Sequence, residues 1–414
     1  MFEGEIPLPW TLRMTTAISI AAAPLILYLI VKLMRSVSRL CWPNGNQGSG
    51  LERLFSHKST MGAVFAGVNI YPLTMILIQD EISDGDPWTY LSLVYPYWTL
   101  ILVVAQFVPI ILLNDMLKLP LRRIFKRNRE RWLKTESYGI IGLVVFGTLY
   151  VGSTMYRDTN TVQISKMLLP VSELPTTLDG FRIAHISDLQ ADPLTTDENM
   201  QRYVDTINGL KPDLVVFTGD LVTRGTEYID AGARMMGRIK ARHGVIACMG
   251  DHDVWSSSEL IAIALRRNGV VVLENGHHVV IQDSARIAVS GLTSTYSRRS
   301  SRISTDDLAA SRPPADFNMI IAHQPREHVV ESASTQEYHL FCGGHTHGGQ
   351  VVVGWFGWIF TPVMTETPFL AGVYQMGDMS ISINNGLGLT MAPVRFQAPA
   401  EVTLITLTRS ADAI

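Results

Sequence analysis

The sequence predicts an α/β domain preceded by an all-α transmembrane region, and three features of the chain lead to that fold class. Long apolar runs fill the first 156 residues. Beyond Thr161 the pattern changes to short runs rich in Val, Ile and Phe that alternate with helical stretches and Gly/Pro turns. Five of the short runs end in Asp or His. We therefore expect a membrane region over residues 1–156 and a second domain over residues 157–414.

The composition of the 414 residues supports this division. Hydrophobic residues make up 47% and charged residues 17% of the chain, a balance too apolar for one soluble domain. A formal net charge of -3 gives no basis for nucleic-acid binding. Cys41, Cys248 and Cys342 are too few and too scattered for a disulfide framework or a zinc knuckle. Cys248 and Cys342 lie on predicted strands, where we expect them to be small core residues.

Four apolar runs in the first region are long enough to cross a bilayer, which takes about 20 helical residues. The runs cover residues 12–34, 60–79, 89–113 and 137–156. Glu3 and Glu5 precede the first run and no small-residue cleavage site follows it, which argues against a removable signal peptide. A soluble helical bundle is the alternative, but the runs show no polar stripe. The sequence therefore predicts a four-helix membrane anchor.

The loops between the runs predict the orientation of the chain. Basic side chains gather in residues 32–58 and 118–134, whereas the connection at residues 80–86 is acidic. Because basic loops stay in the cytoplasm, we expect an integral, multi-pass protein of the cell membrane whose second domain is extracytoplasmic. Residues 118–134 could also bind anionic lipid. A plain topology signal is the simpler interpretation of that segment.

Carboxylates and imidazoles close five short runs of the second domain. The runs end at Asp188, Asp220, Asp251, His323 and the pair His345 and His347. The aspartates follow one another at about thirty residues, the length of a strand–helix–strand unit. Parallel strands end at one edge of a sheet, where ligands bind, so the five motifs should converge. A lone Gly-Asp is usually a turn or a helix cap, and only the set of five favours a site.

Carboxylate and imidazole ligands without a thiolate suit Mn, Fe, Zn or similar divalent ions. The sequence therefore predicts a metal site where the five runs end. Gly219, Gly250, Gly343 and Gly344 would let the chain turn sharply as each strand ends.

In the order of these blocks, residues 161–409 resemble the calcineurin-like metallophosphoesterase superfamily. The family's order is Asp-x-His, Gly-Asp, Gly-Asn-His-Asp/Glu, a single His and Gly-His-x-His. Here it reads Asp188-Leu-Gln190, Gly219-Asp220, Gly250-Asp251-His252-Asp253, His323 and Gly344-His345-Thr-His347. The extension to Gln350 and the tail at residues 393–404 resemble a bacterial, membrane-linked branch, some of whose members act on lipids.

The resemblance implies a four-layer sandwich, with two mixed β-sheets flanked by helices, and two divalent metal ions (Mn, Fe, Zn or Mg). Asp188 and His347 would hold the first ion, Asp220 would bridge both, and Asp251, His323 and His345 would hold the second. A metal-bridging hydroxide would attack a phosphodiester, pyrophosphate or phosphomonoester, in a lipid or envelope substrate. His252 would protonate the leaving oxygen and Asp253 would orient His252. The sequence indicates no oligomeric state.

Two positions depart from the family pattern. Gln190 stands where the family has a histidine ligand, and Asp251 stands where it has asparagine. A neutral amide oxygen is a weaker and harder ligand than imidazole, so we expect a looser first metal site or a preference for Mn or Mg. The alternative is a catalytically impaired, metal-binding regulatory or scaffold protein of the membrane. His252 and Asp253 favour the hydrolase, because binding alone would not require them.

Three other features have two interpretations each. His185 lies on a predicted buried strand and is expected to be a hydrogen-bonded core residue, not a ligand. The arginine-rich residues 297–302 could grip a phosphate, but a solvated loop is favoured. Residues 351–360, with Trp355 and Trp358, could dock on the bilayer interface. A strand and hairpin packed in the second sheet is the favoured interpretation there.

Overall fold

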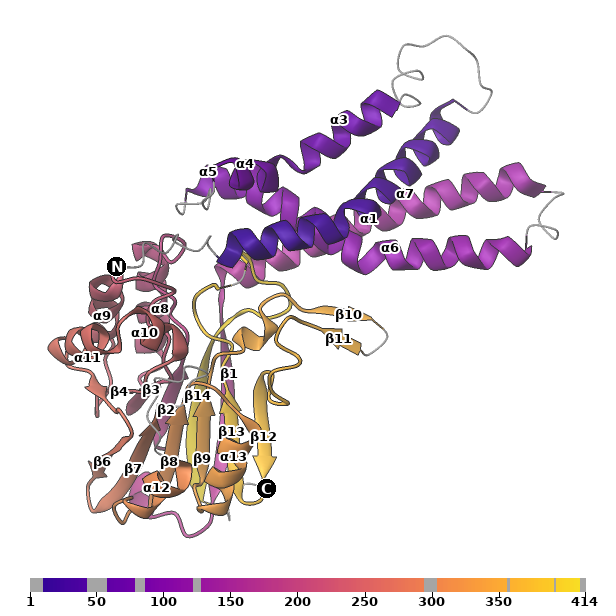
Figure 1. The fold of residues 1–414 in the computed structure, drawn as a ribbon. Helices are drawn as coiled ribbons and strands as arrows, with labels where there is room; N and C mark the ends of the chain where they lie inside the picture. Colours follow the sequence, from indigo (N-terminus) through magenta and orange to yellow (C-terminus); the bar gives the residue numbers. More distant parts are fainter. Residues whose placement is uncertain are drawn as a thin grey trace. The chain divides into compact units, whose positions relative to one another are not determined.

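The computed structural model describes residues 10–42, 58–78, 86–121, 128–293, 304–355, 358–390 and 392–409. Its contacts divide the chain into two compact units (Figure 1). The helical unit comprises Met1–Arg157 together with Val353–Phe360 and Met391–Phe396. The α/β unit comprises Asp158–Val352, Thr361–Thr390 and Gln397–Ile414.

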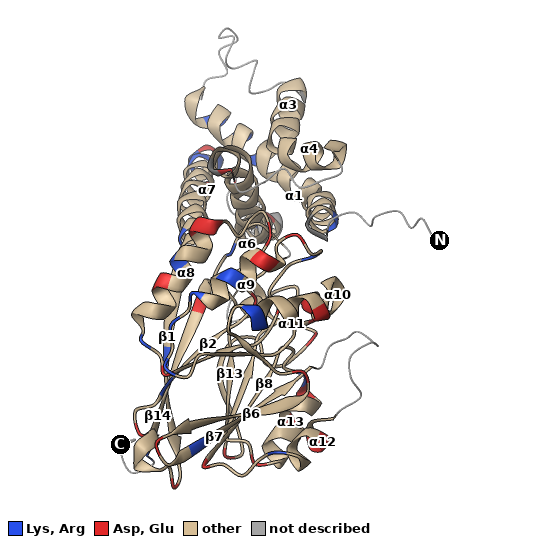
Figure 2. Cartoon of the chain, turned by 90° about the vertical axis from the view of Figure 1, so that its left-hand side faces the viewer, with Lys and Arg blue, Asp and Glu red and all other residues tan. Residues whose placement is uncertain are grey.

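The helical unit contains three stretches that are long and apolar enough to cross a membrane. They are Leu12–Cys41, Tyr90–Lys118 and Arg129–Asn160. Its helices are α1 (Trp10–Cys41), α3 (Lys58–Val68), α4 (Ile70–Ile78), α5 (Pro87–Thr89), the π-helix η1 (Tyr90–Val94), α6 (Tyr95–Leu121) and α7 (Arg129–Asn160). Charged residues are sparse along α3 and α4 (Figure 2). That pair makes a fourth candidate span if both helices cross together.

A bend of 60° separates α3 from α4. Pro72 has no N–H to donate to the carbonyl one turn earlier, and its ring crowds that carbonyl, so the helix breaks. Asn69 lies at the break, where its side chain donates to the carbonyl of Phe65 at 2.8 Å. The sequence predicted one continuous helix over residues 60–79, whereas the described residues form two.

The first sheet of the α/β unit has the strand order β1-β14-β2-β3-β4-β5. Its strands are β1 (Val162–Val171), β2 (Arg182–Ile186), β3 (Leu214–Phe217), β4 (Val245–Ala247), β5 (Val271–Val272) and β14 (Ala400–Arg409). Strands β2 to β5 run parallel, and β14 is antiparallel to β2. The helices α8 (Asp197–Gly209), α9 (Ile229–Gly237) and α11 (Ser258–Arg267) share a core with this sheet.

The second sheet has the order β12-β13-β9-β8-β7-β6. Its strands are β6 (Gly276–Gln282), β7 (Ala285–Leu292), β8 (Phe317–Ala322), β9 (Leu340–Gly343), β12 (Gly372–Met376) and β13 (Met379–Ile383). Strands β7, β8, β9 and β13 run parallel, with antiparallel neighbours at both edges. The helices α12 (Thr305–Ala310) and α13 (Glu327–Thr335) contribute to the core behind it.

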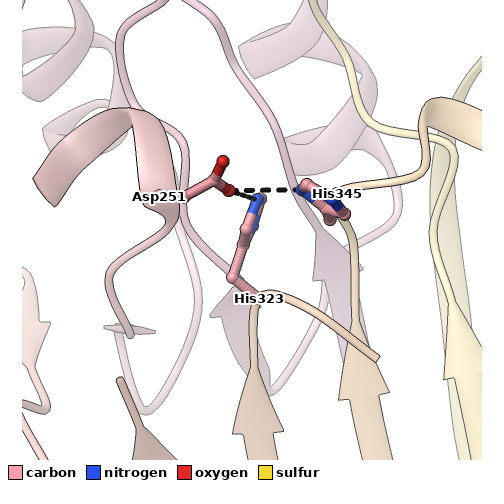
Figure 3. Close-up of side chains that lie close together, drawn as sticks. All are labelled: Asp251, His323 and His345. Atoms are coloured by element: carbon pink, nitrogen blue, oxygen red, sulfur yellow. Dashed lines mark ion pairs between the residues drawn. The ribbon is translucent and has the colours of Figure 1, made fainter. Parts of the chain in front are cut away.

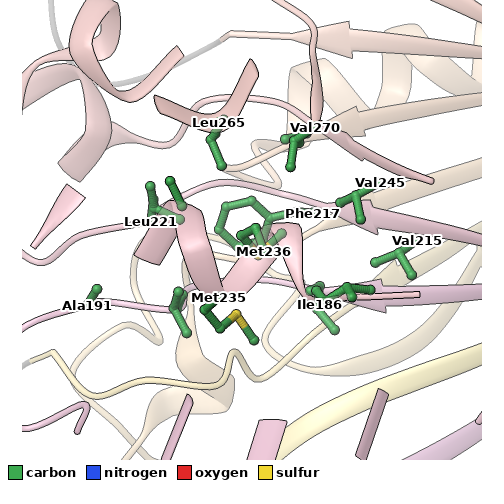
Figure 4. Close-up of a cluster of buried hydrophobic side chains, with 14 of the residues drawn as sticks. Ile186, Ala191, Val215, Phe217, Leu221, Met235, Met236, Val245, Leu265 and Val270 are labelled. Atoms are coloured by element: carbon green, nitrogen blue, oxygen red, sulfur yellow. The ribbon is translucent and has the colours of Figure 1, made fainter. Parts of the chain in front are cut away.

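Alternation along the strands builds a core on each face of the first sheet. On β3, Val215 and Phe217 pack among residues of the helices (Figure 4), whereas Leu214 and Val216 pack against residues of the second sheet. A strand buried on both faces is a continuous apolar run, as this one is. The predicted four-layer sandwich of two mixed sheets flanked by helices is therefore confirmed.

The segment after the histidine pair differs from the favoured prediction. Strands β10 (Val353–Trp355) and β11 (Trp358–Phe360) form a separate two-stranded hairpin and do not join the second sheet. The hairpin belongs to the helical unit, where the indole N–H of Trp355 donates to the backbone carbonyl of Gln106 in α6 at 3.1 Å. Packing against a helix has therefore replaced pairing with a sheet edge.

Candidate metal centre

Strands of both sheets deliver the candidate ligands at their carboxyl ends. In the first sheet, Asp188 follows β2, Asp220 follows β3, and Asp251 begins α10 (Asp251–Ser256) after β4. In the second sheet, His323 follows β8 and His345 follows β9. Because β2, β3 and β4 are neighbours and so are β8 and β9, these loops meet although they are far apart in sequence.

His323 lies at the middle of the group. Its Nε2 is 3.1 Å from Asp220 Oδ2, 3.0 Å from Asp251 Oδ1 and 3.8 Å from Asp188 Oδ1. Asp251 Oδ1 is also 3.2 Å from His345 Nδ1 (Figure 3). On the other side, His347 Nε2 is 3.2 Å from Asp188 Oδ1. Two sets of possible ligands, Asp188-Asp220-His323 and Asp251-His323-His345, each keep their donor atoms within 4.8 Å of one another.

Four of these ligand atoms are buried and make no well-aligned hydrogen bond in the described part of the chain, although three of them lie 3.0–3.2 Å from an atom of the opposite partner in a His–Asp pair. They are Asp188 Oδ1, Gln190 Oε1, Asp251 Oδ1 and His323 Nε2. An unsatisfied buried polar atom costs about 1–3 kcal/mol, so four in one place need an explanation. Divalent cations would satisfy all four, and carboxylate, amide and imidazole donors suit such ions. The residues present therefore fit the metal ions that the sequence predicted.

The backbone holds many of these residues in a left-handed conformation. Positive φ angles occur at Asp188 (50°), Gln190 (48°), Asp220 (60°), His345 (70°) and His347 (50°). Such angles cost non-glycine residues roughly 1–3 kcal/mol each and persist at sites that the surrounding structure holds firmly. The surrounding structure therefore holds the ligand loops in conformations that side chains rarely adopt.

Two glycines leave room for carboxylates. A Cβ at Gly250 would overlap Asp220 Oδ1, and a Cβ at Gly344 would overlap Asp188 Oδ2. Gly250 has an extended backbone (φ −97°), so its role is close approach and not the sharp turn that we predicted. Gly219, with φ +96°, does need glycine's conformational freedom.

In His323 and His345, one ring nitrogen contacts a group outside the cluster of aspartates, and this contact orients the other ring nitrogen toward the aspartates. The Nδ1 of His323 donates to the carbonyl of Thr218 at 2.8 Å, and the Nε2 of His345 lies 3.0 Å from Glu366 Oε2. A ring nitrogen that donates outward leaves the other nitrogen for a metal, which is how metal-binding histidines are usually oriented. Thus Nε2 of His323 and Nδ1 of His345 are the nitrogens that face the aspartates of the site.

The carboxylates and imidazoles shift one another's pKa values. Burial alone would lower the pKa of His323, but the charges of Asp220 and Asp188 outweigh it and raise that pKa well above its usual value. Burial would lower the pKa of His345 too, yet its hydrogen bonds to Asp251 and Glu366 raise it to about 9. Without an ion, the excess of carboxylates therefore draws protons onto the imidazoles, and a cation would replace those protons.

Residues 181–349 match the model of the calcineurin-like phosphoesterase family. This chain carries a calcineurin-like metallophosphoesterase domain. Because this family consists of phosphoesterases, the chain is a hydrolase of phosphoric esters. The bacterial branch expected from the sequence is consistent with its relatives.

Named relatives agree with the family. The chain is 29% identical over 302 residues to a protein named uncharacterized metallophosphoesterase YkuE from Bacillus subtilis (strain 168), covering 68% of this chain and 98% of that protein. It is 26% identical over 282 residues to a Danio rerio protein named transmembrane protein with metallophosphoesterase domain, covering 65% of this chain. The match spans 62% of the Danio rerio protein, which is less than two thirds of its length.

Gln190, the departure at the first metal position of this metallophosphoesterase, lies beside the carboxylate predicted to bridge the ions. Its Nε2 donates to Asp220 Oδ2 at 2.9 Å, and its Oε1 is buried without a hydrogen bond. A histidine there would offer a lone pair where the glutamine offers an N–H. The prediction of a weaker first metal site is therefore compatible with this contact and stays a prediction.

His252 and Asp253 lie next to the group, but not in the relation that we expected. The carbonyl of Thr223 lies 2.5 Å from His252 Nδ1, and the imidazole lies 5.0 Å from the ring of the exposed Trp255 at an interplanar angle of 54°. Asp253 is buried and accepts from the backbone N–H groups of Gly250, Asp220 and Leu221 at 2.8–2.9 Å. The expectation that Asp253 orients His252 was therefore wrong, because adjacent residues of a helix do not face each other.

Asp253 instead ties together the loops that follow β3 and β4. Burial, followed by the charge of Asp220, raises the pKa of Asp253 to about 7. The backbone N–H groups of Gly250 and Leu221 oppose that rise in pKa. We assign it a positioning role, since the amides that it holds belong to the loops carrying Asp220 and Asp251.

Sequence reasoning missed three groups that hold the site. Glu366 supports His345, the carbonyl of Thr218 supports His323, and the carbonyl of Thr223 supports His252. Thr218 precedes Gly219-Asp220 directly, so its position at a strand end was a usable signal. Glu366 lies in a segment without a motif, and nothing in the sequence marks it.

The remaining sequence interpretations have mixed outcomes. His185 is fully buried and lies 2.9 Å from Ser382 Oγ, which confirms a hydrogen-bonded core histidine. Cys248 and Cys342 are confirmed as buried core residues with free thiols. The arginine-rich residues 297–302 lie outside the described residues.

Proposed function

We propose that this chain is a membrane-anchored phosphoesterase that uses two divalent ions held by the strand-end residues. The observation that carries the proposal is the convergence of buried carboxylate, amide and imidazole atoms on both sides of His323, where they could serve as metal ligands. Asp188, His347 and Gln190 form the proposed first site. Asp251, His323 and His345 form the second, and Asp220 lies between them. Ions bound there would lower the pKa of water and polarise phosphoryl oxygens.

His252 is the proposed proton donor to the leaving oxygen. Its Nδ1 faces the Thr223 carbonyl, so Nε2 is the atom left to carry a proton to substrate. Its backbone N–H donates to Asp220 Oδ1 at 3.0 Å, which places the residue beside the proposed bridging ligand. The ring is partly exposed, as a group that meets substrate must be.

The test is hydrolysis of a chromogenic phosphodiester and a phosphomonoester by the full-length protein with added Mn. We expect Asp220→Ala to lose most activity on either ester and His252→Ala to lose most activity on an ester with an alkoxide leaving group, whereas His278→Ala, at a partly buried position of β6, keeps it. Equal activity in all three variants would reject this site. Bound metal without turnover of any ester would instead favour the regulatory or scaffold protein, which the altered ligand at Gln190 makes worth testing.

We further propose that the substrate is a lipid or envelope phosphoester and that the α/β unit is extracytoplasmic. Support comes from the hairpin, because β10 begins six residues after His347 and Trp355 bonds to a helix long and apolar enough to span a membrane. Trp358 is 73% exposed, and Ile359 and Phe360 are also exposed. Aromatic side chains of this kind favour the bilayer interface.

Serine substitution of both hairpin tryptophans tests the lipid part of the proposal. Trp355→Ser with Trp358→Ser should lose turnover of a lipid phosphodiester in mixed micelles and keep turnover of a small soluble ester. Trp88→Ser, at another exposed tryptophan, is the matched control. Equal losses on both substrates would contradict a membrane role for the hairpin. Protease protection of a tag after residue 409 in intact cells would test the orientation.

A further inference from the structure

A cavity of about 810 Å³ lies within the helical unit, far in sequence from the metal centre. It is lined by the C-terminal parts of α1 and α6 and by the first turns of α7. Five of its lining residues are basic: Lys32, Arg35, Arg39, Lys118 and Arg129. Only two, Asp115 and Glu136, are acidic. The lining therefore carries an excess of three positive charges.

The two lysines are already matched to the two carboxylates. Lys32 Nζ is 2.7 Å from Asp115 Oδ1 and 3.1 Å from Glu136 Oε1. Lys118 Nζ is 2.8 Å from Asp115 Oδ1 and also pairs with Glu136. This cluster joins α1, α6 and α7 and is neutral as a whole, so it places no demand on a ligand.

The three arginines are not matched by any carboxylate of the described residues. Arg39 donates to the hydroxyl of Ser137 at 3.1 Å. The side chains of Arg35 and Arg129 make no hydrogen bond or ion pair within the described part of the chain. Guanidinium groups bind phosphate through paired N–H donors, and three around one cavity repel one another unless an anion is present.

A topology signal explains basic residues near the end of a span, but it does not explain their convergence. Arg131 and Lys134 of α7 are basic and exposed, and neither lines the cavity. Arg35, Arg39 and Arg129, by contrast, come from two helices and face one volume. The position of those three arginines calls for a reason beyond the positive charge of the loop.

We propose that this cavity binds a phosphate-bearing anion, and that the anion is the headgroup of an anionic phospholipid. Apolar side chains border the arginines, since Leu112 and Met116 line the same cavity and Met116 is 65% exposed. Trp132, which packs its ring under Lys118 at 5.1 Å, adds an amphipathic side chain suited to the headgroup level. A lipid there would join α1 to α7 through its phosphate.

The test uses the full-length protein in neutral detergent, with phosphatidylglycerol and phosphatidylcholine as the two lipid probes. Lipid retained by the protein is measured by native mass spectrometry, and the unfolding temperature is measured with each lipid. We expect phosphatidylglycerol to be retained and to stabilise the protein. We expect the double variant R35Q/R129Q to bind it roughly 10- to 30-fold more weakly, since each surface arginine contributes about fivefold.

The double variant R131Q/K134Q is the matched control, because it removes two charges from the same helix outside the cavity. Equal loss in both double variants would overturn the proposal in favour of diffuse attraction, and so would equal retention of both lipids. If R35Q/R129Q does not fold, R35K/R129K keeps the charge and removes the paired N–H donors, and it should still bind more weakly.

Two further measurements distinguish a lipid phosphate from a soluble one and separate the cavity from the metal centre. Inorganic phosphate and glycerol 3-phosphate should not stabilise the protein as phosphatidylglycerol does; stabilisation by these soluble anions at equal concentration would overturn the lipid assignment and retain the phosphate site. Turnover of a soluble chromogenic diester should be unchanged in R35Q/R129Q. The proposal for the cavity can therefore fail while the proposal for the metal centre holds, and the reverse.

Discussion

The two polar clusters of this chain have opposite charge balances. In the α/β unit, the carboxylates of Asp188, Asp220 and Asp251 gather around His323, and no lysine or arginine of the described residues pairs with them. In the helical unit, two lysines neutralise two carboxylates and three arginines remain. The comparison teaches that the uncompensated charge, more than the number of charged residues, indicates the ligand: cations at the first cluster and an anion at the second.

The largest expected effect comes from filling the space that Gly250 leaves for Asp220. In Gly250→Ala the new methyl group displaces the Asp220 carboxylate, so metal binding fails and kcat/KM falls by about 10³-fold or more. Metal content by elemental analysis and turnover of a chromogenic ester measure both effects. Gly276→Ala, where a Cβ meets nothing within 4 Å, should be near neutral. Retention of both metals in Gly250→Ala would contradict the inference that the Asp220 carboxylate binds them.

The next effect separates proton transfer from metal binding. His252→Ala should lower kcat by roughly 10²-fold on an ester with an alkoxide leaving group, and much less on a nitrophenyl ester, whose leaving oxygen needs no proton. Metal content should stay that of the wild type, because His252 is not among the converging ligands. An equal loss on both esters would remove His252 from the role of general acid.

Restoring an imidazole at the first metal position should tighten that site. Gln190→His replaces an amide N–H that points at Asp220 with a ring that can offer a lone pair, so affinity for the weaker ion should rise about tenfold. Isothermal titration of the metal-free protein with Mn and Zn measures the change. Two equally tight ions in the wild type would show that the site was never weakened.

The smallest effect concerns pH. In the metal-free protein the pKa of His345 is raised from 6.5 to about 9, so stabilisation by its charged form is complete below about pH 6.5 and lost as pH rises through 9. Metal binding has the opposite trend, because the proton must leave, so affinity rises with pH up to about 9. Glu366→Gln should move the midpoint of the rise in metal affinity down toward pH 6.5, whereas Glu331→Gln, at an exposed position of α13, should not. An unchanged midpoint would contradict the role of Glu366.

The sequence predicted the α/β unit better than the helical unit. Strand-end aspartates and histidines at regular intervals implied a common edge, and the structure places Asp220 Oδ2 and Asp251 Oδ1 within 3.1 Å of His323 Nε2. That inference works because the carboxyl ends of neighbouring parallel strands are adjacent whatever the conformation of the loops that follow them. It fails for Glu366, whose contact with His345 depends on a loop without a repeating pattern.

Contacts between distant helices were beyond the sequence. Lys32 and Glu136 are 104 residues apart, and only the packing of α1 against α7 brings them together. The hairpin at Val353–Phe360 was misjudged for a similar reason, because alternation predicts a strand but not its partner. The family resemblance implied that Asp253 orients His252, whereas its carboxylate accepts from the backbone N–H groups of Gly250, Asp220 and Leu221.

The path of the chain after His347 has a practical consequence. Residues 353–360 and 391–396 belong with the helices, although they lie inside the catalytic sequence. A truncated enzyme that starts at residue 158 would keep these two segments and lose α6, whose Gln106 carbonyl accepts a hydrogen bond from Trp355. Trp355 would then lose its contact with α6 and add to the already exposed Trp358, Ile359 and Phe360, so such a fragment should self-associate unless the hairpin is removed as well.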